Sequence, residues 1–203
     1  MNEIIIATQN KGKAKEFEQM FAPRGYKVLT LLDFPELKDV EETGATFEEN
    51  AILKAEAISQ ALGKMAIADD SGLVVDALAG KPGIYSARYA GEEKNDEANI
   101  DKVLKELIEI PDQKRTAHFY CALAVAIPGQ EAFTFFGTCE GKILHERKGT
   151  NGFGYDPIFF SLEENRSMAE LSAEEKNRIS HRANALKKLD EQIDFFLAKE
   201  AEQ

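Results

Sequence analysis

The stretch MAIADDSG, residues 65–72, decides the fold class of this chain. It predicts a short buried strand, residues 65–68, that runs directly into two adjacent carboxylates, Asp69 and Asp70. Buried strands of parallel sheets are unbroken apolar runs, and their carboxyl ends open onto the crevice where α/β proteins bind ligands. Two acids at that edge repel each other unless a cation or a proton lies between them. Since Asp and Ser are also common turn residues, a simple turn cap is the competing interpretation.

Strand and helix signals alternate on the amino-terminal side of this stretch. The β-branched run at residues 3–8 and the apolar run at residues 26–31 are predicted strands, with an amphipathic helix between them. The helix that leads into the acids begins after Thr46, which has the capping-box spacing to Glu49, and ends at Gly63. This order indicates α/β architecture.

The second half of the chain predicts antiparallel strands. Residues 117–127 and 132–138 flank a Pro-Gly turn, and residues 141–144 and 158–160 add short strands. Further helices are predicted at residues 100–108, after a capping box formed by Ser172 and Glu175, and over residues 186–197. We therefore expect an α/β fold with a mixed, partly antiparallel central sheet flanked by helices. The expected organisation is a single catalytic domain, residues 1–203, made of two lobes with a cleft between them.

Composition excludes several classes of protein. The chain has 203 residues and a net charge of −11, which argues against a general nucleic-acid binder but not against a small anionic ligand. Neither a signal peptide nor an apolar run long enough to span a membrane is present, so no membrane association is expected. Cys121 and Cys139 lie in strand-like segments without zinc-ligand spacing. Buried reduced thiols and a cytoplasmic location are therefore expected.

Four carboxylates form a candidate metal site. Glu41 and Glu42 lie in the loop before the helix that leads to Asp69 and Asp70, so the chain can return them to the same edge of the sheet. Such hard oxygen ligands hold Mg²⁺ together with waters and substrate phosphates. A carboxylate not fully used by the metal could orient or deprotonate a water molecule. The competing interpretation of the Glu41-Glu42 pair is a solvated acidic run.

A second candidate site would bind phosphate. The polar loop at residues 9–13 precedes a helix, whose amino terminus offers free N–H groups and the positive end of a dipole. Thr8 and Asn10 would face that position; the loop is not a Walker A motif, and an ordinary strand–helix turn is the alternative. The candidate cations are Lys13, Lys176 and Arg182, with Lys11 and Arg88 as further candidates.

A glycine-rich stretch, KGTNGFGYDP at residues 148–157, allows a close approach of the backbone to a ligand. A flat aromatic side chain there could stack on a base. His181, next to Arg182, could donate to a carbonyl group of that base, although a hydrogen-bonded structural histidine is the competing interpretation.

Taken in order, these motifs resemble the non-canonical purine nucleoside triphosphate pyrophosphatases, the inosine triphosphate pyrophosphatase family. The resemblance covers nearly the whole chain. The matching segments are ATQNKGK (7–13), EETGATF (41–47), IADDSGL (67–73), PGIYSARY (82–89), GFGYDP (152–157) and SHR (180–182).

The resemblance implies hydrolysis of dITP, ITP and XTP to the nucleoside monophosphate and pyrophosphate by a Mg²⁺-dependent homodimer. It makes Asp70 the general base and a metal ligand together with Glu41, for which Glu42 remains the alternative. The implied phosphate-binding residues are Thr8, Gln9, Asn10, Lys11, Gly12, Lys13 and Lys176, with Ser71 as a further substrate contact. The implied base-binding residues are Phe153, Gly154, Tyr155, Asp156, His181 and Arg182.

One departure from the family pattern is Gln9, where a glycine or another small residue is common. We expect it to alter loop packing more than activity. Two other functions compete with the pyrophosphatase: a Maf-like pyrophosphatase acting on another nucleotide, and a nucleotide-sensing module without hydrolysis. The Ser-Pro-Arg-Arg signature of the first is absent from the sequence. A nucleotide-sensing module, which only binds an anion, would gain no affinity from four clustered acids.

Overall fold

The computed structural model describes residues 2–37 and 40–201. The chain divides into two compact units. Unit 1 comprises Met1–Asp70, Ala122–Phe136 and Ala185–Gln203, and unit 2 comprises Ser71–Cys121 and Gly137–Asn184. The first crossing from unit 1 to unit 2 therefore falls at the peptide bond between Asp70 and Ser71.

The described residues form one seven-stranded mixed sheet, with the strand order β2-β1-β3-β4-β5-β6-β7. Its strands are β1 Asn2–Ile6, β2 Tyr26–Thr30, β3 Ala66–Val75, β4 Thr116–Ala126, β5 Phe133–Ile143, β6 Phe159–Ser161 and β7 Arg166–Ser167. β1 pairs in parallel with β2 and β3, whereas β6 pairs antiparallel with β5 and β7. The predicted mixed α/β sheet is confirmed.

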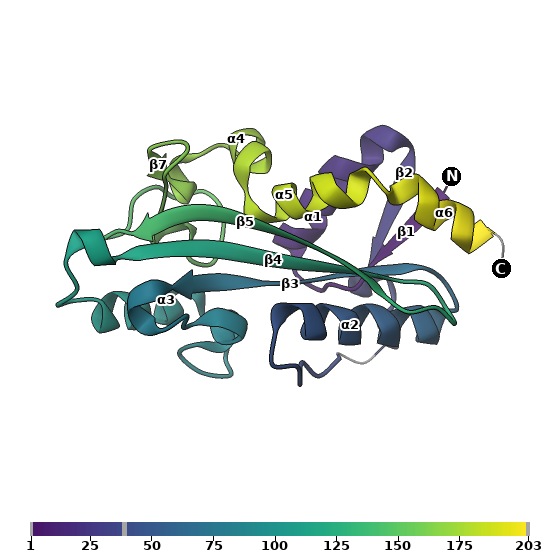
Figure 1. Ribbon diagram of the computed structural model, residues 1–203, viewed down its shortest axis with the longest axis horizontal. Coiled ribbons are helices and arrows are strands. Elements are labelled where there is room, and N and C mark those ends of the chain that lie inside the picture. Colours follow the sequence, from purple (N-terminus) through teal and green to yellow (C-terminus); the bar gives the residue numbers. More distant parts are fainter. Residues whose placement is uncertain (1, 38–39, 202–203) are drawn as a thin grey trace. The chain divides into compact units, whose positions relative to one another are not determined.

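Helices flank these strands. They are α1 Lys11–Phe21, α2 Phe47–Leu62, α3 Asp96–Glu106, α4 Ala173–Ile179, α5 His181–Asp190 and α6 Ile193–Ala201. In unit 1, α2 covers one face of the strands while α1 and α6 lie on the other (Figure 1). The predicted caps of α2 are confirmed, because the Thr46 side chain accepts from the Glu49 N–H and Gly63 adopts a left-handed conformation.

β3 is longer than the sequence predicts. The acids do not end the strand, because it continues through Asp69 and Asp70 to Val75. Leu73 and Val75 are buried and keep the strand in its pleat. β1 pairs only with Ala66 and Ile67 of β3, so the acids lie beyond the carboxyl end of β1. The turn-cap interpretation is thus wrong.

Other boundaries also shift. α1 begins at Lys11 rather than after residue 13, because the Asn10 side chain accepts from the N–H groups of Gly12 and Lys13. The short strand predicted at residues 141–144 is the end of β5. The single last helix is in fact two helices, α5 and α6. α5 starts earlier than expected because the Ser180 hydroxyl accepts from the Ala183 N–H.

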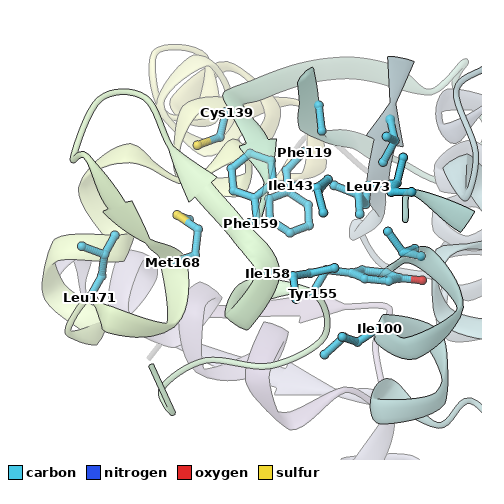
Figure 2. Close-up of a cluster of buried hydrophobic side chains, with 14 of the residues drawn as sticks. Leu73, Ile100, Phe119, Cys139, Ile143, Tyr155, Ile158, Phe159, Met168 and Leu171 are labelled. Carbon is cyan, nitrogen blue, oxygen red and sulfur yellow. The ribbon is translucent and has the colours of Figure 1, made fainter. Parts of the chain in front are cut away.

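Unit 2 has its own apolar core, drawn in Figure 2. Phe119 and Phe159 lie at its centre with their ring centroids 4.4 Å apart. Cys139 lies at the edge of this core, and both it and Cys121 are buried free thiols, as predicted. Among the described residues, no helix is long and apolar enough to cross a membrane.

Candidate active site

The loop from β1 to α1 presents a helix amino terminus. Thr8 is buried at the end of β1, and its hydroxyl accepts from the Asn10 N–H at 3.2 Å. Asn10 caps α1 by accepting from the Gly12 N–H at 2.8 Å and the Lys13 N–H at 3.1 Å. Lys11 is exposed in the first turn. The predicted phosphate-binding residues of unit 1 are therefore brought together around a positive helix end.

Asp69 and Asp70 have different partners. Successive side chains of a strand point to opposite faces, so the two acids need not share a cation. Asp69 Oδ2 lies 2.9 Å from Lys13 Nζ of α1. Asp70 instead contacts α2, where Asn50 Nδ2 donates to its Oδ2 at 3.1 Å. Their mutual repulsion is relieved by separate partners on α1 and α2.

Lys54, one turn after Asn50 on α2, contacts Glu42, Asp69 and Asp70. Its Nζ donates to Glu42 Oε1 at 2.6 Å and to the Asp69 carbonyl at 2.7 Å, and lies 3.6 Å from Asp70 Oδ1. Burial favours the neutral amine, but the charges of Asp70, Asp69 and Glu42 together raise the pKa of Lys54. The ammonium group therefore stays charged among the carboxylates.

Asp70 is poised to accept a proton. Burial raises the pKa of its carboxyl from 3.8 to about 6, and the nearby charge of Glu42 adds to this shift. Lys54, Lys13 and Asn50 act in the opposite direction. A carboxyl group with a pKa near the operating pH is suited to general-base chemistry.

The donor set is suited to a hard divalent cation. Glu42 is half-buried and bound to Lys54, whereas Glu41 is exposed. Within residues 2–37 and 40–201, no group of three acidic, histidine or cysteine side chains is arranged to hold a metal by protein ligands alone. Mg²⁺ usually takes one or two carboxylates and completes its shell with water and phosphate. Asp70 together with one of the two glutamates would therefore be enough protein ligands for such an ion.

In unit 2, the glycine-rich loop is built around Asp156. Its buried carboxylate accepts from the Phe153 N–H at 2.9 Å and from Lys176 Nζ at 2.7 Å. The same Nζ lies 4.3 Å from the centroid of the Phe153 ring. Gly152 is required here, since its φ is +79° and a Cβ would come 2.0 Å from Asp156 Oδ2. The loop thus presents one aromatic ring at a set position.

Two further contacts hold this loop. Asp96, the first residue of α3, accepts from the Gly154 N–H at 2.9 Å. The Tyr155 hydroxyl donates to the Ser86 carbonyl at 2.7 Å, and burial raises the pKa of Tyr155, which keeps that hydroxyl protonated. The PGIYSARY segment therefore supports the glycine-rich loop through Ser86.

His181 and Arg182 are the first two residues of α5. The His181 ring stacks on Phe119 with centroids 4.8 Å apart and an interplanar angle of 19°. The buried Arg182 guanidinium donates through Nη2 to Ser71 Oγ at 2.9 Å. Three residues predicted to contact substrate, Ser71, His181 and Arg182, are thus ordered within unit 2.

The structure brings the predicted residues together as two sets, one in each unit. The set of unit 1 contains Thr8, Gln9, Asn10, Lys11, Gly12, Lys13, Glu41, Glu42, Asp69 and Asp70. The set of unit 2 contains Ser71, Phe153, Gly154, Tyr155, Asp156, Lys176, His181 and Arg182. Arg88 instead lies 5.3 Å from the ring of the exposed Tyr85.

Sequence reasoning missed two residues of α2, Asn50 and Lys54. They are four residues apart, so they lie one above the other on one face of the helix. That face borders the apolar stripe, where a polar pair is unexpected. This pairing is the signal that could have identified them.

Comparisons with known proteins agree with one another. The Ham1 family profile matches residues 4–192. A Bacillus cereus protein named dITP/XTP pyrophosphatase is 58% identical over 202 residues, which covers 98% of each chain. The solved structure of the Staphylococcus aureus Ham1 protein is 50% identical, covers 95% of this chain and 98% of its own, and superposes with a TM-score of 0.85. A HAM1 protein from Coxiella burnetii is 41% identical, covers 96% of this chain and 99% of its own, and has a TM-score of 0.87. With a profile match and relatives that span nearly all of its length, this chain belongs to the Ham1 family.

Proposed function

We propose that this chain hydrolyses the purine nucleoside triphosphates dITP, ITP and XTP to the nucleoside monophosphate and pyrophosphate. The observation that carries the proposal is Asp70, a buried carboxyl group with a pKa of about 6, which follows Asp69, whose Oδ2 lies 2.9 Å from Lys13 Nζ in the first turn of α1. The Ham1 membership and the names of the relatives support this class of reaction over a Maf-like enzyme or a nucleotide sensor.

The phosphate groups are bound by unit 1. The positive end of the α1 dipole and the side chains of Thr8, Asn10 and Lys13 receive the triphosphate, with Gln9, Lys11 and Gly12 in the same turn. Asp70 accepts a proton from a water molecule that attacks the α-phosphorus, and pyrophosphate leaves. Most of the acceleration comes from positioning and from neutralisation of charge.

A divalent cation belongs to this proposal. Asp70 and Glu41 would hold Mg²⁺, which when bound neutralises phosphate charge and polarises the phosphoryl group. Glu42 is the alternative ligand, because it already acts on the pKa of Asp70. Lys54 contacts both Glu42 and Asp70 and so keeps these two carboxylates close together despite their like charge.

The base is recognised by unit 2. Phe153 stacks on the purine while Gly154, Tyr155 and Asp156 shape the loop, and Ser71 and Lys176 contact the substrate, Lys176 through a phosphate. His181 and Arg182 donate to the 6-oxo group. Adenine carries an amino donor at that position, so ATP would leave these donors unpaired, and buried unpaired groups are strongly penalised. We propose that both units serve one catalytic domain, which acts as a cytoplasmic homodimer.

A nucleotide panel tests the proposal. Purified protein with Mg²⁺ should release pyrophosphate from ITP, dITP and XTP much faster than from ATP. Omission of Mg²⁺ should abolish the reaction. Equal turnover of ATP, or release of single phosphate groups, would contradict the proposal.

A further inference from the structure

Asn50 is a buried residue of α2 to which the proposed mechanism gives no role. It is 1% exposed, and both ends of its amide are hydrogen-bonded. Its Oδ1 accepts from the Gly44 N–H at 2.8 Å, and its Nδ2 donates to Asp70 Oδ2 at 3.1 Å. One side chain therefore joins the loop of Glu41 and Glu42 to the carboxylate of Asp70.

We propose that Asn50 is a positioning residue for catalysis, which holds the Asp70 carboxylate and the acidic loop, residues 41–44, in one relative arrangement. The inference rests on the proposed function, since it assigns to Asn50 the orientation of the group that activates water. Asn50 acts through Asp70 and does not itself touch the reacting atoms.

The chemistry of the two partners requires an amide at position 50. The Gly44 N–H can only donate, and an ionised Asp70 carboxylate can only accept. A carboxylate at position 50 would keep the first bond, lose the second and add a like charge beside Asp70. An apolar side chain would leave the Gly44 N–H and the Asp70 carboxylate without these bonds, which is costly for buried groups.

The loop at residues 41–44 packs closely against α2, so the hydrogen bond from Gly44 to Asn50 fixes the loop relative to the Asn50 side chain. A Cβ built on Gly44 would lie 2.7 Å from Asn50 Oδ1 and 2.7 Å from Glu49 Cβ, so the loop backbone lies directly against the first turn of α2. The Ala45 N–H also donates to Glu49 Oε2 at 2.6 Å. One turn further along, Lys54 binds Glu42. On the same helix face, Asn50 orients the Asp70 carboxylate through a hydrogen bond, and Lys54 neutralises charge on Glu42 and Asp70.

Asn99 of α3 offers a matched control within the same chain. Like Asn50, it is the fourth residue of its helix and is buried, with 2% exposed. Its Oδ1 accepts from the Ala90 N–H at 2.6 Å and its Nδ2 donates to the Ala87 carbonyl at 3.0 Å. These partners are backbone groups of a loop, so Asn99 has the structural role of Asn50 without the contact to Asp70.

The experiment compares Asn50→Asp with Asn99→Asp in the full chain. Each variant is assayed for its Tm and for kcat and KM with ITP at saturating Mg²⁺. We expect Asn50→Asp to lower kcat by about tenfold or more, as loss of a hydrogen bond to a charged group would, with KM changed by less than about twofold. Asn99→Asp should lower Tm and leave kcat unchanged.

The contradicting results are distinct. An Asn50→Asp protein with wild-type kcat, or an equal loss of kcat in Asn99→Asp, would overturn the positioning role alone. If Asn50→Asp does not fold, Gly44→Ala is the second test, because the added Cβ would displace the Asn50 side-chain amide. The kcat of Gly44→Ala should fall while its KM is retained. An unchanged kcat would overturn the inference. A wild-type protein that releases no pyrophosphate from ITP would overturn the proposed function as well.

Discussion

At the scale of the residue, Asp70 combines two opposing demands. Burial raises its folded-state pKa from 3.8 to about 6, which suits a general base but makes the ionised carboxylate costly. Because the folded pKa exceeds the unfolded pKa, Asp70 contributes stability that is fully present below about pH 4. That contribution is lost as the pH rises through about 6. Near neutral pH, this residue therefore favours activity at the expense of stability.

Asp70→Asn should separate these demands. The variant should lose ITP turnover, because Asn accepts no proton, while the metal-free protein becomes more stable at pH 8. The gain should be at most about 3 kcal/mol, since each pH unit between the folded and unfolded pKa corresponds to about 1.4 kcal/mol. Chemical unfolding with a chelator at pH 8 and pH 4 measures it, and the gain should vanish at pH 4. Retained turnover would remove Asp70 as the base.

The sequence predicted candidate site residues by motif but not their partners. The acids, the Thr8–Lys13 turn and the His181-Arg182 pair could be named as candidates in advance because their motifs match a known family. Asn50 and Lys54 were not named, because the apolar stripe of α2 accounted for the helix and the spacing of the polar pair gives no partner. Their role depends on the return of the Glu42 loop to α2, which is a tertiary contact.

At the scale of the element, the glycine-rich loop depends on a buried ion pair. Asp156 and Lys176 are both buried, with 2.7 Å between carboxylate and ammonium, and they connect the loop to α4. Loss of one partner of such a pair leaves a buried charge without compensation, whereas loss of both does not.

Lys176→Met should therefore destabilise the protein by about 3–5 kcal/mol. It should also raise KM for ITP, because Phe153 would lose both the cation above its ring and a rigid Asp156. Adding Asp156→Asn should restore much of the stability. A double-mutant cycle by denaturant unfolding measures the coupling. Additive effects of the two substitutions would show that the pair is not coupled.

Element types were more predictable than element ends. The capping-box spacings at Thr46 and Ser172 located two helix starts, because the hydrogen bonds of these caps lie within a few residues. β3 is longer than predicted, because its apolar run is interrupted by two adjacent acids. Their partners on α1 and α2, which allow the strand to continue, cannot be seen in the sequence. The break between α5 and α6 was hidden in the same way by a continuous helical period.

At the scale of the whole molecule, the sheet connects the two sets of candidate site residues along the chain. β3 belongs to unit 1 up to Asp70 and to unit 2 from Ser71, so the proposed base and a proposed substrate contact are consecutive residues. The fold class followed from the alternation of strand and helix signals. Two lobes were expected, but the segments that make up each unit were not predicted, because they depend on which distant parts of the chain pack together.

Arg115 should be critical for the stability of unit 2. It is 2% exposed, and its guanidinium donates to the carbonyls of Leu107, Ile143 and Leu144 at 2.6–2.8 Å. Arg115→Met should lower the free energy of unfolding by about 3 kcal/mol or more, because the three hydrogen bonds of the buried guanidinium to these carbonyls are lost. Denaturant unfolding measures this, with the exposed Arg147→Met as the control. Equal stability of the two variants would contradict the role of Arg115.

The central claim is that water attacks the α-phosphorus of a purine nucleoside triphosphate with Asp70 as the base. Hydrolysis of ITP in ¹⁸O-labelled water, followed by mass spectrometry of both products, tests it most directly. Attack at the α-phosphorus should place the label in IMP and none in pyrophosphate, and Asp70→Asn should give neither product. Label in pyrophosphate, or in free phosphate released together with IDP, would contradict it.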